Sequence, residues 1–391
     1  MLHPLSSASQ HATRLVAAAR QLADRLNHSS RIGRDDLNAV MVDVFGCTAA
    51  SGAWTQRDSF VAAEIATILR SREMVLPEEG AACLMALDAL ARLLPTQTVR
   101  SEEQVAHQHF STPLLLAWLA TRMAMIGPDD TVLEPSAGTG MLAQWAGKGR
   151  ALHLNELDPV RAEILRQLFP AASVTTHDAA AIRQLGIRPS VVLMNPPFAR
   201  NAAGKDDPLA AARHIAAALA ALRPGGRLVA IMPDGFSGQG RKADVFARAL
   251  QGGTVAAHFR IEDAFRSHGT RIAIRLLAID KVRGNLNTTV VQRAKLGDLL
   301  AFVTAMPPRA VCPADDVCAT ASVPAFARGA GGKSLFKAFG RPAPASVAAP
   351  VADRSPSADT PNWIDVQWKP VEAHGPDVAT TDVYAAWRPQ R

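Results

Sequence analysis

The sequence has little cysteine and no long hydrophobic run. Its four cysteines are scattered, which excludes a disulfide scaffold and favours reduced thiols. No cysteines and histidines stand at the spacing of a zinc site. The longest apolar stretches, such as 190–195 and 228–233, have the length of strands and are too short to span a membrane. The first ten residues do not form a basic-then-apolar leader, so we expect a cytoplasmic protein without a membrane partner.

The chain has 391 residues, too many for one ordinary domain, and 48% of them are hydrophobic, enough for a packed core. Its net charge of +7 is unevenly distributed. Residues 1–107 carry a net charge of −2, residues 108–280 carry +5 and residues 281–391 carry +4. The positive surplus therefore belongs to the middle and the tail, which points to a polyanionic partner for those parts.

Residues 1–107 have the pattern of a helical domain. Apolar residues recur at helical spacing from Gln10 to Leu94, with breaks at 28–33, 51–56 and 74–80. This pattern predicts three or more helices. Since none of their residues converge on chemistry, we expect this domain to serve packing or partner contact.

Residues 108–283 change to short apolar runs that alternate with helical stretches. The runs predict strands at 131–133, 151–155, 173–176, 191–194, 227–232, 254–260 and 272–280. The stretches between them predict helices at 141–148, 159–169, 209–222 and 241–250. Such alternation is typical of an α/β domain with a doubly wound, mostly parallel sheet. The last two strands follow each other closely enough to pair antiparallel at one edge.

The C-terminal part has a different composition. We expect residues 284–361 to be a linker, since this range becomes rich in proline, alanine and glycine from residue 307. Residues 362–391 regain three tryptophans and a tyrosine. We expect this segment either to dock on the body of the protein or to lead into a domain beyond it.

A glycine-containing loop follows the first predicted strand, from Glu134 to Gly140 with the sequence EPSAGTG. Gly138 and Gly140 would let the backbone approach a ligand closely at the switch point of the sheet. The loop lacks the Lys-Ser/Thr ending of a triphosphate cradle. Because it opens with an acid, it suits a ligand with a cationic amine or sulfonium. The alternative is a tight turn without a ligand.

Two further acids end predicted strands. Glu156 ends the second strand, where an acid accepts hydrogen bonds from ribose hydroxyls in dinucleotide folds. Asp178 follows the third strand and is placed to accept from the amino group of an adenine moiety. For each of them the alternative is a helix cap.

The tetrapeptide Asn195-Pro196-Pro197-Phe198 ends the fourth predicted strand, beside the glycine loop. The prolines fix the backbone and remove two N–H donors, so carbonyl oxygens face the site. The side-chain oxygen of Asn195 and the carbonyl of Pro196 can accept both hydrogens of one planar amino group. That arrangement localises the nitrogen lone pair, and Phe198 would offer a flat face for an extruded base. The alternative is a proline turn with a core phenylalanine.

With these motifs, residues 108–280 resemble the class I S-adenosylmethionine-dependent methyltransferases that act on amino groups, and most of all the adenine methylases of DNA. The element from Gln108 to Pro113 is similar to the family's motif ahead of the first strand. The resemblance implies a Rossmann-like, seven-stranded, mostly parallel sheet with helices on both faces, behind the N-terminal helical domain. It implies that S-adenosylmethionine is bound by Phe110, Ser111, Thr112, Glu134, Pro135, Ser136, Ala137, Gly138, Gly140, Glu156, Asp178 and Asn195. It implies that the catalytic residues are Asn195, Pro196, Pro197 and Phe198, without a metal.

The expected function is methyl transfer to the N6 amine of adenine in DNA, with Phe198, Arg200, Lys205 and His268 toward the substrate. The basic residues and His268 are equally explained as plain surface. The chain also resembles the methylase half of methylase–helicase fusions of plasmids, phages and mobile elements, which implies a helicase domain or subunit as a partner. It departs from DNA methylases in lacking a sizeable recognition domain after the catalytic one.

Two alternatives remain open from the sequence. The same chemistry could serve RNA or a protein glutamine, although those enzymes favour tyrosine as the fourth residue of the tetrapeptide. The second alternative is a function of another class: a non-catalytic module with a cofactor-binding fold that partners a helicase. The intact tetrapeptide and Glu156 argue against it.

Overall fold

The computed structural model describes most of the first 309 residues. The described ranges are 6–28, 30–96, 111–198, 205–266, 272–282, 289–294, 296–306 and 308–309. The chain divides into two units, Met1–Phe326 and Ala327–Arg391. The predicted C-terminal segment 362–391 lies outside the described residues.

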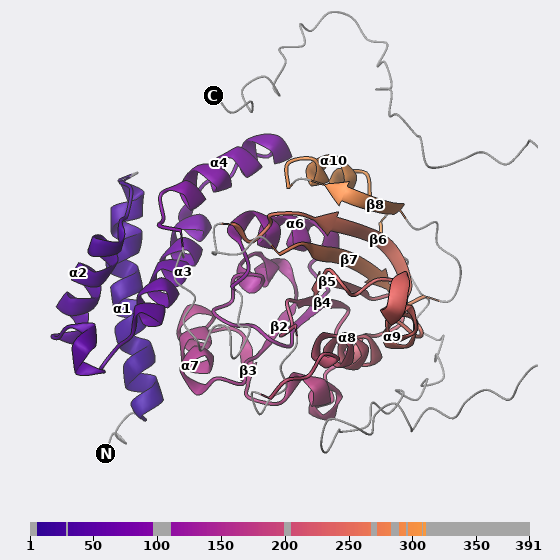
Figure 1. Ribbon diagram of the computed structural model, residues 1–391, viewed down its shortest axis with the longest axis horizontal. Helices are drawn as coiled ribbons and strands as arrows, with labels where there is room; N and C mark the ends of the chain where they lie inside the picture. Colours follow the sequence, from indigo (N-terminus) through magenta and orange to yellow (C-terminus); the bar gives the residue numbers. More distant parts are fainter. Residues whose placement is uncertain are drawn as a thin grey trace, which may run out of the picture. The chain divides into compact units, whose positions relative to one another are not determined.

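The N-terminal region is helical, as the sequence predicts. Its elements are α1 (Ser7–Asn27), α2 (Arg34–Phe45), the 3-10 helix η1 (Ala49–Ser51), α3 (Gln56–Glu73) and α4 (Gly80–Arg92). The helices α1, α2 and α3 pack on one another (Figure 1). Thr55 begins α3 with a capping box, in which its side chain accepts from the Asp58 N–H and the Asp58 carboxylate accepts from the Thr55 N–H. The predicted breaks at 28–33 and 74–80 match the gaps between the helices, whereas the gap between α2 and α3 begins earlier than the predicted 51–56, after Phe45, and contains η1.

The sheet confirms the predicted Rossmann-like, mostly parallel architecture. Its predicted strands are β1 (Thr131–Glu134), β2 (Ala151–Asn155), β3 (Ser173–Thr175), β4 (Val191–Met194), β5 (Arg227–Pro233), β6 (Thr254–Ile261) and β7 (Ile274–Asp280). They lie in the order β3-β2-β1-β4-β5-β7-β6, and all pairs from β3 to β5 are parallel. The strand β7 is antiparallel to both β5 and β6, which confirms the predicted antiparallel pair.

The chain continues past the boundary predicted at residue 283. An eighth strand, β8 (Thr289–Ala294), pairs parallel with β6, so the pair of β6 and β7 does not form the edge of the sheet. The helix α10 (Leu299–Thr304) follows, and Arg309 binds Asp130 through both guanidinium Nη atoms, at 2.8 and 2.6 Å. The range predicted to be a linker therefore begins with folded structure, because β8 completes an open sheet edge.

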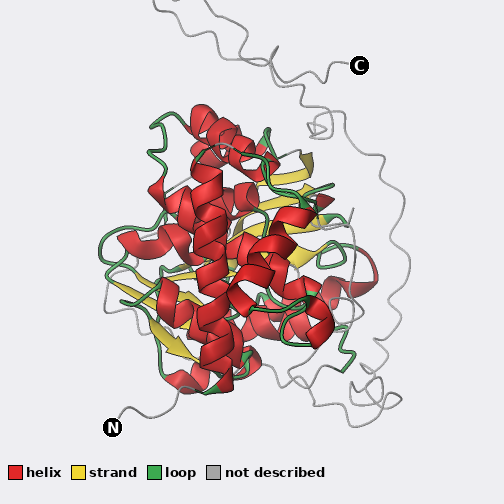
Figure 2. Cartoon of the chain, turned by 90° about the vertical axis from the view of Figure 1, so that its left-hand side faces the viewer, coloured by secondary structure: helices red, strands yellow, loops and turns green. Residues whose placement is uncertain are grey.

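Helices cover both faces of the sheet. One face carries α6 (Leu114–Ala124), α7 (Pro159–Leu168) and the N-terminal helices, and the other carries α8 (Ala210–Ala221) and α9 (Ala243–Ala249). The side chains of β4 alternate between the two cores: Val191 and Leu193 face the first, and Val192 and Met194 face the second. Figure 2 shows a layer of helices in front of the strands. Both faces are buried, which explains the continuous apolar runs of the strands.

The remaining elements are short 3-10 helices: η2 (Ala143–Lys148), η3 (Ala179–Leu185) and η4 (Gly240–Lys242). The element η2 stands where the sequence predicts a longer helix at 141–148. The helix α6 was not predicted, because its residues are almost all apolar and show no helical period. None of the described helices is long and apolar enough to cross a membrane.

The helical region is joined to the sheet domain by specific polar contacts. Ser71 at the end of α3 donates to Oε1 of Gln144 at 2.5 Å. Arg72 donates to the carbonyl of Leu168 at 3.0 Å, and its guanidinium lies 4.1 Å from the centre of the Phe169 ring. Burial lowers the pKa of Arg72 to about 10. The helix α3 is therefore fixed against η2 and the end of α7.

A buried ion pair joins the neighbouring strands β5 and β7 at one end. Arg227 on β5 and Asp280 on β7 are register partners and are 0% and 2% exposed. The guanidinium donates from Nε to Oδ1 at 2.6 Å and from Nη2 to Oδ2 at 2.8 Å, and Nη1 donates to the carbonyl of Met123. Such a bidentate pair satisfies both charges where water cannot.

We expect Asp280→Asn to lower the free energy of unfolding by about 3–5 kcal/mol, because Arg227 would keep a buried charge without its partner. The matched control is Asp88→Asn, which breaks the exposed pair of Asp88 and Arg92 and should cost about 1 kcal/mol or less. Urea unfolding of both variants measures the difference. Equal losses would contradict the structural role of the buried pair.

Candidate functional site

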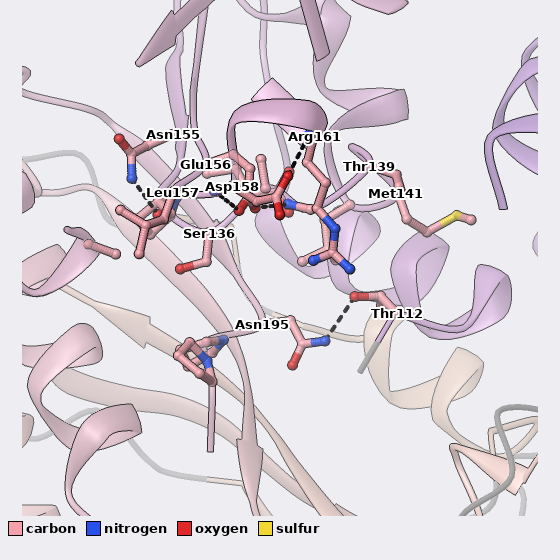
Figure 3. A pocket seen from close by; sticks show the side chains of 18 of the residues that line it. Thr112, Ser136, Thr139, Met141, Asn155, Glu156, Leu157, Asp158, Arg161 and Asn195 are labelled. Atoms are coloured by element: carbon pink, nitrogen blue, oxygen red, sulfur yellow. Dashed lines mark hydrogen bonds between the residues drawn. The ribbon is translucent and has the colours of Figure 1, made fainter. Parts of the chain in front are cut away.

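A cavity of about 280 Å³ opens at the carboxyl ends of β1, β2 and β4 (Figure 3). Parallel strands bring their carboxyl ends to one edge, so residues far apart in the sequence meet there. Its lining residues are Glu64, Ser111, Thr112, Glu134, Pro135, Ser136, Ala137, Gly138, Thr139, Met141, Leu142, Asn155, Glu156, Leu157, Asp158, Arg161, His177, Asp178, Ala179, Asn195, Pro196, Pro197 and His214.

The loop after β1 is held against β2 by its own backbone. The N–H of Ala137 donates to the carbonyl of Asn155 at 2.9 Å, and the N–H of Gly138 donates to Oε2 of Glu156 at 2.7 Å. Gly138 has φ +56°, a left-handed conformation that favours glycine. Pro135, Ser136, Ala137 and Gly138 all line the cavity, and their binding of a cofactor stays a prediction.

Gly140 packs against Phe169 and, contrary to what the sequence suggests, does not let the backbone approach a ligand. It does not line the cavity. Its φ is +91°, and an added Cβ would lie 2.3 Å from a carbon of the Phe169 ring. At Gly138, by contrast, an added Cβ would meet nothing within 4 Å. Gly140 therefore permits close packing of the loop on the end of α7.

Asn155 joins three segments of the site, a role that the sequence analysis missed. Its Nδ2 donates to the carbonyls of Pro135 and His177, at 2.9 and 2.8 Å. Its Oδ1 accepts from Thr175 Oγ1 and from the His177 N–H, each at 2.9 Å. With 1% of its surface exposed, this amide connects the loop after β1 to the end of β3.

Glu156 is a buried carboxylate bound by backbone donors. Its Oε2 accepts from Gly138 and its Oε1 accepts from the N–H of Asp158, at 2.7 and 2.9 Å. Burial raises the pKa of Glu156, although Arg161 and these N–H groups act against that shift. The Asp158 side chain caps α7 by accepting from the Arg161 N–H.

Glu134 is the acid with the most perturbed surroundings. It is 2% exposed, and its Oε2 has no hydrogen-bond partner among the described residues. Burial raises its pKa well above the ordinary value, and the nearby charges of Glu156 and Glu64 raise it further. An unsatisfied buried carboxylate of this kind fits a cationic ligand.

Asp178 lines the cavity and also caps a helix. Its Oδ1 accepts from the Ala180 N–H at 2.9 Å at the start of η3. Both predicted interpretations of this residue are therefore compatible with its position.

His214 on α8 is a lining residue that the sequence analysis missed. It is 6% exposed, and its Nδ1 has no hydrogen-bond partner in the described part of the chain. Burial lowers its pKa to about 4, so the imidazole is neutral at neutral pH. A histidine within an alanine-rich helix carries no motif that would have identified it.

Asn195 lines the cavity at the end of β4. Its Nδ2 donates to Oγ1 of Thr112 at 3.0 Å, and its Oδ1 points away from Thr112 (Figure 3). Pro196 and Pro197 line the cavity beside it, and Pro196 is buried. Thr112, predicted from the motif ahead of the first strand, therefore orients the amide of the tetrapeptide.

Phe198 lies elsewhere than predicted. Its side chain is 9% exposed, belongs to the hydrophobic core and does not line the cavity. In this structure it packs among the apolar side chains of the core and so does not offer a flat face to a base. Lys205 is exposed and also does not line the cavity. Phe110, Arg200 and His268 lie outside the described residues.

The lining of the cavity is strongly acidic. Among its described residues, Glu64, Glu134, Glu156, Asp158 and Asp178 carry carboxylates, and Arg161 is the one lysine or arginine. Glu64 comes from the helical region and was not expected at the site. No group of three metal-ligating side chains occurs in the described ranges. The site is thus suited to an organic cation with further hydrogen-bonding groups.

No protein-family model matches the chain, and no curated protein matches it. Solved structures match at low identity. A putative class I S-adenosylmethionine-dependent methyltransferase from Listeria monocytogenes is 14% identical, with a TM-score of 0.42, over 77% of this chain and 97% of that one. A modification subunit of a putative type I restriction enzyme from Vibrio vulnificus is 16% identical, with a TM-score of 0.38, over 66% of this chain and 60% of that one. TrmN from Thermus thermophilus is 20% identical, with a TM-score of 0.32, over 45% of this chain and 51% of that one.

This chain thus spans about half the length of TrmN.

We expect Gly140→Ala and Gly138→Ala to differ in their effect on stability. Both impose left-handed strain of about 1–2 kcal/mol on an alanine. Gly140→Ala adds the clash with Phe169, an overpacking of about 1–3 kcal/mol. Urea unfolding should therefore show the larger loss for Gly140→Ala, and an equal loss would contradict the packing role of Gly140.

Proposed function

We propose that this chain transfers a methyl group from S-adenosylmethionine to the exocyclic N6 amine of adenine in DNA. The observation that carries this proposal is the position of Asn195. Its amide lies in the same cavity as the acids of β1 and β2, is bound by Thr112, and is followed by two prolines that line the cavity.

The cavity residues fit the cofactor's charges. S-adenosylmethionine carries a sulfonium and an ammonium, and the lining holds five carboxylates, one of them with an unsatisfied oxygen. Glu156 would take the ribose hydroxyls and Asp178 the adenine amino group, as the family resemblance implies. Bound S-adenosylmethionine supplies an electrophilic methyl group.

The tetrapeptide would prepare the acceptor nitrogen. Asn195 Oδ1 and the carbonyl of Pro196 would accept the two hydrogens of the adenine amine. Those hydrogen bonds favour a tetrahedral nitrogen and localise its lone pair, so a weakly basic amine becomes nucleophilic without a general base. The bond from Asn195 Nδ2 to Thr112 fixes the amide in the orientation that this task requires.

The choice of adenine in DNA rests on the sequence motifs. The tetrapeptide ends in phenylalanine, and Ser111-Thr112-Pro113 precedes α6, as in the DNA methylases that the chain resembles. The net charge of +5 on residues 108–280 suits a polyanionic substrate. Since Phe198 is buried in the core, stacking of the base is not assigned to it.

We expect Asn195→Ala to lower the rate of methyl transfer by about 100-fold or more, the usual effect of losing one preorganised hydrogen bond at a reacting group. Cofactor affinity should stay within a small factor. Asn195→Asp is the matched control, because a carboxylate keeps the acceptor oxygen and the Thr112 hydroxyl can donate to it. Single-turnover transfer and calorimetric binding of the cofactor separate the two effects. Loss of cofactor binding together with transfer would show that Asn195 is structural.

The acceptor is tested by offering radiolabelled S-adenosylmethionine with DNA, RNA and protein acceptors in parallel. We expect label in DNA, recovered as N6-methyladenine after digestion. Label in RNA or in protein glutamine would contradict DNA as the acceptor and identify that molecule as the substrate instead. Cofactor binding without transfer to any acceptor would favour a non-catalytic module, such as one that partners a helicase.

A further inference from the structure

The helical region contributes a side chain to the cavity. Glu64 lies in the middle of α3 and lines the cavity together with acids of the sheet domain. Ser111 Oγ donates to Oε2 of Glu64 at 2.6 Å. Ser111 directly precedes Thr112, which binds Asn195. Glu64 is therefore hydrogen-bonded to the residue that directly precedes Thr112, and Thr112 orients the tetrapeptide.

Glu64 occupies an otherwise apolar part of its helix. The neighbouring Val61, Ala62, Ile65 and Ile68 are buried in the core. Burial raises the pKa of Glu64, against the hydrogen bond from Ser111 and the charge of Arg161. A carboxylate in such surroundings costs stability unless a cation accompanies it. Packing of α3 alone gives no reason for a charge at this position.

Glu64 and Glu134 line the same cavity, and their charges act on each other. The charge of Glu64 raises the pKa of Glu134, whose Oε2 is buried without a partner in the described part of the chain. Two repelling carboxylates that share a cavity are both stabilised by one cation placed between them. Arg161, whose charge acts on both Glu64 and Glu156, lines the same cavity and is its one described lysine or arginine.

A zwitterionic amino-acid group has the matching charges. We propose that Glu64 and Glu134 together hold the ammonium of the methionine part of the cofactor, with Arg161 facing its carboxylate, so that α3 forms part of the cofactor site. This assignment rests on the proposed function. Glu156 and Asp178 stand at other strand ends and would serve the ribose and the adenine.

With Glu64 bound to the ammonium, the affinity for the cofactor and the packing of α3 on the sheet domain would depend on each other. The helix α3 is bound to the sheet domain through Ser71 and Arg72, so a ligand held by Glu64 bridges the same interface. By linkage, the formed interface would strengthen cofactor binding by the same factor by which the bound cofactor stabilises the interface.

The test compares the full-length chain with Glu64→Gln and with Glu73→Gln, which changes an exposed acid at the end of the same helix. Calorimetry measures the affinity for three ligands: S-adenosylmethionine, S-adenosylhomocysteine and 5′-methylthioadenosine. The first two carry the amino-acid group and the third lacks it. We expect Glu64→Gln to weaken binding of the first two about tenfold or more, equivalent to about 1.4 kcal/mol, and to leave the third unchanged. Glu73→Gln should change none of them.

Thermal unfolding provides a second measurement. The glutamine of Glu64→Gln keeps the size of the side chain and removes the repulsion with Glu134, so the ligand-free protein should unfold at the same or a higher temperature than wild type. The upward shift caused by S-adenosylmethionine should be smaller than in wild type. A lower melting temperature of the ligand-free variant would mean that Glu64 is structural and would overturn the assignment.

The remaining outcomes separate the two proposals. Unchanged affinity of Glu64→Gln for S-adenosylmethionine, or an equal loss for all three ligands, would overturn the role of Glu64 while the proposed function stands. Failure of the wild-type chain to bind S-adenosylmethionine would instead overturn the proposed function.

Discussion

The amide of Asn155 is the contact on which the site depends. A parallel sheet brings strand ends to one edge but leaves the loops that follow them unconnected. Asn155 uses both amide hydrogens and its oxygen to join the loop after β1, the end of β2 and the segment after β3. Because the amide is fully buried, each lost bond would leave an unsatisfied polar group. The junction adds to the pairing of β1 with β2, which places Glu134 opposite Leu154, two residues before Glu156.

Buried charge is treated differently in the sheet and in the cavity. In the sheet, Arg227 and Asp280 neutralise each other through two short hydrogen bonds. In the cavity, Glu64, Glu134 and Glu156 each have a pKa raised first of all by burial. A cluster of acids of this kind opposes folding of the ligand-free chain at neutral pH, since each raised pKa means stability lost as the pH rises above the ordinary value. A bound cation would therefore stabilise the folded chain, because it would neutralise carboxylates in the cavity that the chain's own basic residues leave unneutralised.

Much of the fold and part of the site could be predicted from the sequence. The strands of a sheet buried on both faces appear as short apolar runs, and polar motifs at their ends must meet at one edge. That reasoning places Glu134, Glu156 and Asn195 in one cavity, where the structure has them. It fails for Gly140 and Phe198, because a glycine loop and a terminal aromatic do not reveal whether they face a ligand or the core. It also fails for β8, which pairs parallel with β6 from a range whose composition predicts a linker.

Glu64 shows most clearly what a sequence pattern hides. Helical periodicity assigns an acid beside apolar residues to the solvent side of a helix, and so the N-terminal region looks like a packing module. The tertiary structure reverses this, because α3 lies against the sheet domain and the acid meets Ser111 across the interface. The hydrogen bond from Ser111 places the acid next to Thr112 and thereby next to Asn195. One continuous set of contacts thus runs from the helical region through Ser111 and Thr112 to the tetrapeptide.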